Sequence, residues 1–360
     1  MSIIQEIRDL KKAKLEGYVR CLPCQLDRFK DYYPGLVKGE PTCITGNTSS
    51  WKTGLTKKLF VYDSIEYAIK TGLDLKILYF GFEESKRQAK WHMLSYLAYR
   101  RFGMRYNNRE FDAMNHGVLD EDLTKLEQSN IDQELNLWKS YINWYDTPMT
   151  AYGVYKTVRD FAASRGTFYH KGKEINYDLL GAEDVSWDTY KPNNPREFVI
   201  VIFDHASKVK TKKGQTKHEA MQELSDYLQQ QIAYKFDYAP VIVQQQSNEG
   251  QNLDHVKAGH WMPQLSTMGK NAEIAQDYRV IIGIGNPKRY KIKNYHSYEI
   301  DKFKGFIRFA NILKQTYGPV DIEVPLYVDG KTGYTESLPK PDNIAELTKI
   351  YQKIDTINGF

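Results

Sequence analysis

Short, nearly continuous apolar runs separated by longer amphipathic stretches dominate the pattern of this chain. Such runs predict buried strands, which we expect at residues 42–45, 75–82, 141–145, 198–203, 240–244 and 279–284. Between them, apolar residues recur at helical spacing and predict helices at residues 55–70, 85–101, 219–236 and 264–276. Strands that alternate with helices predict an α/β fold with a mostly parallel central sheet flanked by helices.

The segments outside this alternation suggest how the chain is divided. Residues 306–314 and 320–328 predict a C-terminal antiparallel hairpin. Residues 166–197 are rich in Gly, Asn, Pro and Tyr, and we expect an insertion there. The expected parts are an N-terminal helix or linker at 1–21, one main domain at 22–340 and a C-terminal helix or tail at 341–360.

At the N-terminus, Ile3, Ile4, Ile7 and Leu10 lie at the spacing of an amphipathic helix. The apolar face of this helix has two candidate partners, the core of its own chain and a neighbouring subunit. The sequence does not choose between them.

Residues 41–53 hold the main chemical signal, because a short strand enters a polar loop that ends in Lys52-Thr53 and leads into a helix. This is the plan of a P-loop, G-x-x-x-x-G-K-[ST], in which backbone N–H groups and the Lys bind phosphates and the Thr holds Mg²⁺. The predicted nucleotide-binding residues are Gly46, Asn47, Thr48, Ser49, Ser50, Trp51, Lys52 and Thr53.

An ordinary Ser/Thr-rich turn is the alternative, because Trp51 stands where the P-loop pattern has its second glycine. A bulky residue at this position is expected to take a positive φ, at a cost of roughly 1–3 kcal/mol.

Polar side chains follow three predicted strands, at the edge where α/β sheets place their chemistry. Glu83 and Glu84 follow the first, where one could activate a water against a γ-phosphate or both could cap the next helix. Asp204 ends the second in a Walker B pattern, in which a carboxylate supports Mg²⁺; Asp also ends buried strands simply to form a turn. Gln245-Gln246 follow the third, where a polar side chain could sense the γ-phosphate.

Lysines gather in the loop after Asp204 and recur in a long polar segment downstream. These lysines could neutralise the phosphates of a nucleic acid strand, or they could form an ordinary solvated surface. The candidate DNA-binding residues are Lys208, Lys210, Lys212, Lys213, Lys257 and Lys270.

Composition narrows the class of protein. The 360 residues are 41% hydrophobic and 26% charged with a net charge of +5, which fits a globular protein and permits nucleic acid as a partner. No apolar run approaches the roughly 18 residues of a membrane span, so we expect a cytoplasmic protein without a membrane partner. Cys21 and Cys24 have the spacing of a zinc or redox pair, but no second ligand pair follows, so reduced incidental thiols are the alternative.

Taken together, several stretches resemble the ATPase domain of DnaB-type replicative helicases, the hexameric branch of the RecA-like ATPases. The resemblance runs from about Leu22 to Leu338 and rests on the order and spacing of its parts. Besides the P-loop and the Walker B strand, these parts are Tyr79–Ser85, Ile142–Thr150, Pro240–Asn248, Leu265–Asp277 and Lys314-Gln315 with Gly318-Pro319.

The resemblance implies a role for each matching residue. Lys52 and Thr53 would bind the phosphates of ATP and Mg²⁺, and Asp204 would support the metal. Glu83 would activate the attacking water.

Two further roles lie outside the phosphate site. Gln246 would couple the nucleotide state to DNA, and Lys314 would act in trans on the nucleotide of a neighbouring subunit. Thr316 stands where the family has its arginine finger, whose absence would lower turnover by on the order of 10³ or more. Lys288 or Arg289 is a candidate substitute.

We therefore expect an ATP-dependent helicase or translocase that acts on single-stranded DNA in replication as a ring, a hexamer by the resemblance. Primase or other replisome proteins are expected partners. The family's N-terminal primase-interacting domain is missing from the chain, which favours a phage or other viral source and the host cytoplasm. Two alternatives share the fold: a hydrolysis-poor accessory or structural DNA-binding protein, favoured by Trp51 and Thr316, and a strand-exchange recombinase, which would form filaments.

Overall fold

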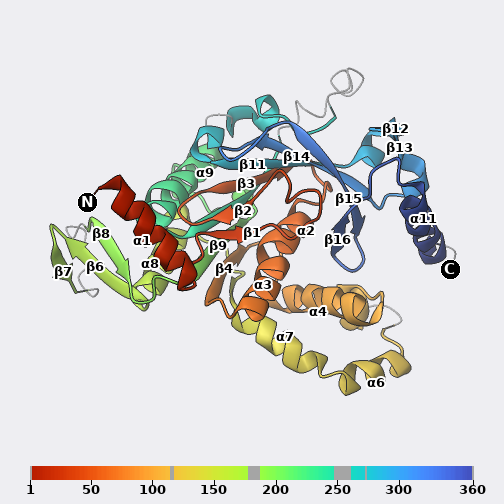
Figure 1. Cartoon of the computed structure of the whole chain (residues 1–360), viewed down its shortest axis with the longest axis horizontal. Helices are drawn as coiled ribbons and strands as arrows, with labels where there is room; N and C mark the ends of the chain where they lie inside the picture. Colours follow the sequence, from red (N-terminus) through yellow and green to blue (C-terminus); the bar gives the residue numbers. More distant parts are fainter. Residues whose placement is uncertain (1, 114–116, 177–186, 247–260, 272–273, 359–360) are drawn as a thin grey trace.

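A computed structural model describes residues 2–113, 117–176, 187–246, 261–271 and 274–358, and a twisted central sheet dominates it (Figure 1). The strand order is β16-β15-β14-β11-β3-β10-β9-β4-β5. In that order the strands are Tyr334–Ser337, Ile322–Asp329, Ile307–Lys314, Val280–Gly285, Thr42–Gly46, Ala239–Gln245, Phe198–Asp204, Leu75–Gly81 and Ile142–Tyr145. Strands β11 through β5 are parallel, whereas β14, β15 and β16 pair antiparallel. The predicted α/β class with a C-terminal antiparallel hairpin is therefore confirmed.

Helices cover both faces of the sheet, which explains why its strands are apolar throughout. Successive residues of β4 enter two different cores: Ile77 lies in one, with residues of α3, α4 and α7, and Leu78 lies in the other, with residues of α8 and α9. These helices are α3 (Asp63–Thr71), α4 (Lys86–Phe102), α7 (Ile131–Ser140), α8 (Ala151–Ala163) and α9 (Lys217–Asp226).

The P-loop strand β3 lies in the middle of the sheet, between β11 and β10. Because β3, β10, β9 and β4 are parallel neighbours, their carboxyl ends meet at one edge. Helix α2 (Lys52–Lys57) starts there and continues through a π-helical turn (Lys58–Tyr62) into α3. The edge of the sheet that carries the P-loop therefore also carries the residues that follow the other predicted strands.

One predicted helix is wrong and one segment is more ordered than expected. Residues 264–276 form two short 3₁₀ helices, Ser266–Asn271 and Ile274–Asp277, instead of one α-helix. The Thr267 hydroxyl donates to the Gln264 carbonyl at 3.0 Å, a local bond that competes with α-helix formation. Residues 166–197, where we expect an insertion, contain a separate antiparallel sheet in the order β7-β6-β8, made of Lys173–Ile175, Gly166–His170 and Thr189–Pro192.

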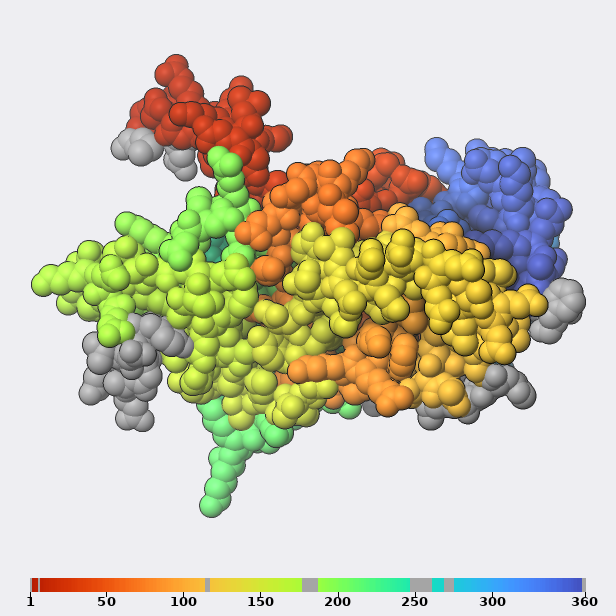
Figure 2. All heavy atoms as spheres, turned by 90° about the horizontal axis from the view of Figure 1, so that it is seen from below, coloured from red at the N-terminus to blue at the C-terminus, as the bar shows by residue number. Residues whose placement is uncertain are grey.

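The N-terminal helix α1 (Ile3–Leu15) stands away from the body of the molecule, as the red segment in Figure 2 shows. Ile3 and Leu10 are 72% and 45% exposed, so its apolar face does not pack on the core of its own chain. At the opposite end, α11 (Ile344–Asn358) joins a third apolar cluster with β14 and β15. Among the described residues no helix is both long and apolar enough to cross a membrane.

The remaining strands and α-helices of the described residues are short. They are β1 (Cys21–Pro23) paired with β2 (Gly35–Val37), β12 (Asn294–Tyr295) paired with β13 (Tyr298–Glu299), and the helices α5 (Asn108–Phe111) and α6 (Asp120–Gln128).

Candidate functional site

The P-loop lies between β3 and α2, and its geometry explains its sequence. A Cβ atom on Gly46 would lie 2.5 Å from the Ile284 carbonyl oxygen and 2.5 Å from Ser50 Oγ, so glycine is required there. Trp51 has φ 88° and ψ 23°, the left-handed conformation expected for the glycine that it replaces. Lys52 begins the helix, so the free N–H groups of its first turn point into the loop.

Trp51 is accommodated by a glycine three residues later. A Cβ atom on Gly54 would lie 2.2 Å from Trp51 Cε2, so the indole ring lies directly against the Gly54 backbone. The indole Nε1 donates to Thr335 Oγ1 at 3.0 Å. The side chain is thus fixed between the start of α2 and strand β16.

Lys52 is buried at the base of the loop, where its Nζ donates to the Asn47 carbonyl at 2.8 Å. Burial lowers the pKa of Lys52 to about 8, although Asp204 and Glu83 act in the opposite direction. Among the described residues this buried cation has a single, neutral acceptor, so it can readily bind an anionic ligand.

Asp204 is held by two hydroxyl groups at the end of β9. Thr53 Oγ1 donates to its Oδ1 at 3.2 Å, and Tyr79 Oη donates to its Oδ2 at 2.7 Å. Burial raises the pKa of Asp204, while the hydrogen bond from Tyr79 opposes this effect. The hydroxyl of Thr53 and the carboxylate of Asp204 are adjacent hard oxygen donors, the ligands that suit Mg²⁺.

The two glutamates after β4 have different environments. Glu84 is buried against Lys57 and His92. Although burial alone would raise the pKa of Glu84, the Lys57 ammonium and His92 lower it to about 2. Glu83 is half-exposed and forms an ion pair of 3.0 Å with Lys208. Neither glutamate caps α4, because Ser85 does so.

The two glutamines at the end of β10, Gln245 and Gln246, also have different environments. Gln245 Nε2 donates to Thr48 Oγ1 at 2.6 Å and faces the loop. Gln246 is buried, where its Nε2 donates to Thr45 Oγ1 at 3.0 Å and its Oε1 accepts from Thr267. Gln246 therefore connects the P-loop strand to the segment that carries the downstream motif, whereas Gln245 lies at the loop itself.

A cavity of about 590 Å³ opens over these groups. Its walls come from the P-loop, from the ends of β4, β9 and β10, and from the turn between β15 and β16. The lining residues that bear on its chemistry are Lys52, Thr53, Glu83, His205, Gln245 and Arg308. Burial lowers the pKa of Arg308 to about 10, and its Nη1 donates only to the carbonyls of Gly305 and Ile307 among the described residues.

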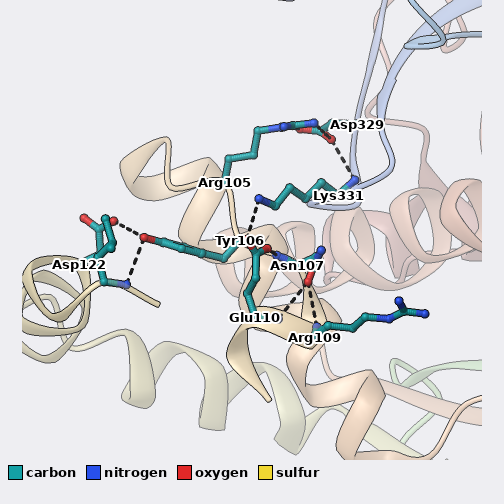
Figure 3. Close-up of polar contacts among 9 residues, drawn as sticks. Arg105, Tyr106, Asn107, Arg109, Glu110, Asp122, Asp329 and Lys331 are labelled. Atoms are coloured by element: carbon teal, nitrogen blue, oxygen red, sulfur yellow. Dashed lines mark hydrogen bonds and ion pairs between the residues drawn. The ribbon is translucent and has the colours of Figure 1, made fainter. Parts of the chain in front are cut away.

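The β15–β16 turn is clamped from the outside by the segment after α4 (Figure 3). Arg105 makes two hydrogen bonds to the Asp329 carboxylate, at 2.7 Å and 3.0 Å. Lys331 Nζ, on the turn, donates to Glu110 Oε1 at 2.9 Å. Because Lys331 also lines the cavity, its wall depends on this cluster of charges.

The structure does not bring every predicted residue to the cavity. Lys314 Nζ donates to the carbonyls of Ala275 and Gln276, at 2.9 Å and 3.1 Å, and does not line the cavity. Thr316 lies in the exposed turn after β14.

The predicted DNA-binding lysines have varied surroundings. Lys208 and Lys212 pair with Glu83 and Glu223, the latter at 2.6 Å. Lys210 and Lys213 are exposed. Lys257 and the side chain of Lys270 lie outside the described residues.

Three residues at the P-loop or the cavity belong to no motif of fixed spacing, so the sequence did not place them there. Arg289 Nη1 donates to the Thr48 carbonyl at 2.5 Å, and Asn286 Nδ2 donates to the Ser49 carbonyl at 3.3 Å. His205 lies directly after Asp204, yet only the structure places it at the cavity. The sequence offered Arg289 as a candidate substitute for the arginine finger but did not show its contact with the P-loop of its own chain.

The cysteines carry no sign of zinc or redox chemistry. Cys24 is buried, and burial raises its pKa to about 12, which disfavours the thiolate that both chemistries need. The described part of the chain contains no group of three His, Cys, Asp or Glu residues that could hold a metal ion.

Comparison with known proteins finds solved structures of similar fold. No family model matches the sequence, and no curated protein matches it. One solved helicase ATPase domain superposes with a TM-score of 0.66 at 16% identity, over 94% of this chain and 99% of that one. A DnaB-like replicative helicase solved in a study of its interactions with primase gives a TM-score of 0.65 at 16% identity, over 94% of this chain and 67% of that one.

The chain has the fold of a DnaB-type helicase ATPase domain. The resemblance deduced from motif order is therefore confirmed at the level of fold. A DnaB-type ATPase fold also fits the position of the P-loop, at the carboxyl edge of the parallel strands.

Proposed function

We propose that this chain is an ATP-dependent motor, a helicase or translocase that acts on single-stranded DNA as a ring-shaped oligomer. The observation that carries the proposal is that Lys52, Thr53 and Glu83 line one cavity and that Thr53 donates a hydrogen bond to Asp204, so that groups from three strand ends meet. The DnaB-type fold supports it but does not itself supply an activity.

The environment of each of these site residues fits the role that we propose for it. Lys52, a buried cation, would neutralise the terminal phosphates of ATP, together with the N–H groups at the start of α2. Thr53 and Asp204 would hold Mg²⁺, which when bound neutralises charge on the phosphates. Glu83 would polarise the attacking water, because Glu84 is already committed to Lys57 and His92.

The path from nucleotide to DNA would use two connections. Lys208 belongs to the basic loop and pairs with Glu83, so this pair joins a proposed DNA contact to the proposed base. Gln246 joins β3 to Thr267, at the start of the segment that would face DNA. Because Lys314 is bonded within its own chain, its proposed action in trans requires that it leave these carbonyls.

Partners and place in the cell are part of the same proposal. We propose a homo-oligomer, by analogy a hexamer, that works with primase or other replisome proteins in the cytoplasm, that of the host if the source is a phage. The DnaB-like helicase of similar fold was solved in a study of its interactions with primase.

Unwinding of a forked DNA, with negative-stain images of the same sample, tests the motor proposal. ATP-dependent strand separation by rings, absent in Lys52→Ala, is the expected result. Filaments with strand exchange would favour a recombinase. Nucleotide binding without hydrolysis or unwinding would favour the accessory DNA-binding protein, for which the left-handed Trp51 and the exposed Thr316 are the specific observations.

A further inference from the structure

His205 is a buried polar residue at the cavity that none of the roles above uses. It follows Asp204 at the end of β9, is 7% exposed and lines the cavity. The charges of Lys52, Glu83 and Lys208 all act on it. It therefore lines the same cavity as the proposed base and the phosphate-binding lysine.

One nitrogen of the ring is already in use. The backbone N–H of Ser207 donates to His205 Nδ1 at 3.3 Å, and Ser207 Oγ lies 3.0 Å from the same atom. Because Nδ1 accepts a hydrogen bond from a backbone N–H, the proton of the neutral ring is on Nε2. His205 Nε2 is buried and has no acceptor among the described residues.

A buried donor without a partner is uncommon in folded proteins. His205 lines the cavity in which the phosphates of a nucleotide would bind, so a phosphate oxygen can supply the missing acceptor. The γ-phosphate is the phosphate nearest the water-activating group in a P-loop site, and Glu83 lines the same cavity as His205.

We infer that His205 donates its Nε2–H to an oxygen of the γ-phosphate, and so lets the site distinguish a nucleoside triphosphate from a diphosphate. This inference rests on the proposed function. It makes His205 a substrate-contacting residue, while its Nδ1 holds the turn at Ala206–Lys208.

Two substitutions separate the two nitrogens. His205→Asn keeps a short polar group that can accept from Ser207 N–H but lacks the distant donor. His205→Gln places an amide N–H near the position of Nε2 and lacks the near acceptor. The measurement is equilibrium binding of ADP and of a non-hydrolysable ATP analogue, both with Mg²⁺, to the full chain.

For His205→Asn we expect the analogue to bind about tenfold to hundredfold more weakly and ADP to bind as before, since a hydrogen bond to a charged group is lost. His205→Gln should retain most of the preference for the analogue, and it is the deciding variant if His205→Asn does not fold. Equal weakening of both ligands, no weakening in His205→Asn, or loss of preference in His205→Gln would overturn the inference.

The same titrations separate this inference from the proposed function. If the wild-type chain binds no nucleotide, or if Lys52→Ala binds as well as wild type, the P-loop proposal fails. If nucleotide binding depends on Lys52 but the His205 variants give one of the results that would overturn the inference, the P-loop proposal stands and only the proposed role of His205 fails.

Discussion

At the scale of single residues, the site depends on side chains that compensate for one another. The left-handed backbone of Trp51 is tolerated because Gly54 leaves room for the indole ring and Thr335 accepts its N–H. The departure from the P-loop pattern at residue 51 is thus matched by a glycine at residue 54. The sequence shows both residues but not that they touch.

The contact between Trp51 and Gly54 predicts that the effect of Gly54→Ala on the free energy of unfolding changes sign when Trp51 is replaced by glycine. Gly54→Ala should lower the free energy of unfolding by about 1–3 kcal/mol, because its Cβ would overlap the ring of Trp51. In a Trp51→Gly background the same change should raise it by up to about 1 kcal/mol, since alanine is the better helix former. Urea unfolding of the four proteins measures both values. Equal effects in the two backgrounds would contradict the packing described.

Glu84 predicts a dependence of stability on pH. Its pKa is lowered from 4.5 to about 2 in the folded chain, so its contribution is present above the unfolded value and is lost as the pH falls toward the folded one. The stability difference between wild type and Glu84→Gln should shrink by about 1 kcal/mol from about pH 6 to about pH 4. Denaturant unfolding at the two pH values checks this. A difference that stays constant would mean that Glu84 is not held by Lys57 and His92.

The residues of the site that could be predicted are those in motifs of fixed spacing. Lys52, Thr53 and Glu83 line the cavity and Asp204 is bonded to Thr53, because each lies at the start or the end of an element of recognisable pattern. Sequence could not separate Gln245 from Gln246. Neighbouring side chains along a strand point to opposite faces of the sheet. The sequence does not tell which face holds the site, so it could not tell which of the two glutamines faces the P-loop.

At the scale of elements, the β15–β16 turn closes one side of the cavity and is held by charges from the α4–α5 segment. Neither segment has a motif, and their contact joins residues far apart in the sequence, which is why sequence reasoning did not find it.

The strands were predicted well because burial on both faces makes them continuously apolar. The helix expected at 264–276 was wrong because polar side-chain bonds compete with helical ones.

Loss of the buried carboxylate should weaken this clamp. Asp329 is 0% exposed, so Asp329→Asn leaves Arg105 without its charged partner and should cost about 3 kcal/mol of stability. Asp160→Asn, in the exposed pair with Lys156, is the control and should cost less than about 1 kcal/mol. Denaturant unfolding gives both values. Equal costs for the two variants would show that the Arg105 pair does not hold the turn.

At the scale of the whole molecule, the fold brings four parallel strand ends to one edge and leaves α1 outside the body (Figures 1 and 2). The alternation of strands and helices was enough to predict this sheet, because α/β architecture follows from it. The placement of α1 could not be predicted, since an amphipathic pattern does not say which surface its apolar face meets. Its exposed Ile3 and Ile4 show that this surface is not the core of its own chain.

If the cavity hydrolyses ATP to drive movement on DNA, single-stranded DNA should change the rate of steady-state ATP hydrolysis, which is therefore measured with and without it. We predict turnover that DNA stimulates and that Lys52→Ala abolishes. Tight nucleotide binding by the wild-type chain with no turnover above that of Lys52→Ala, with or without DNA, would contradict the account and leave a nucleotide-binding DnaB-type fold without a motor.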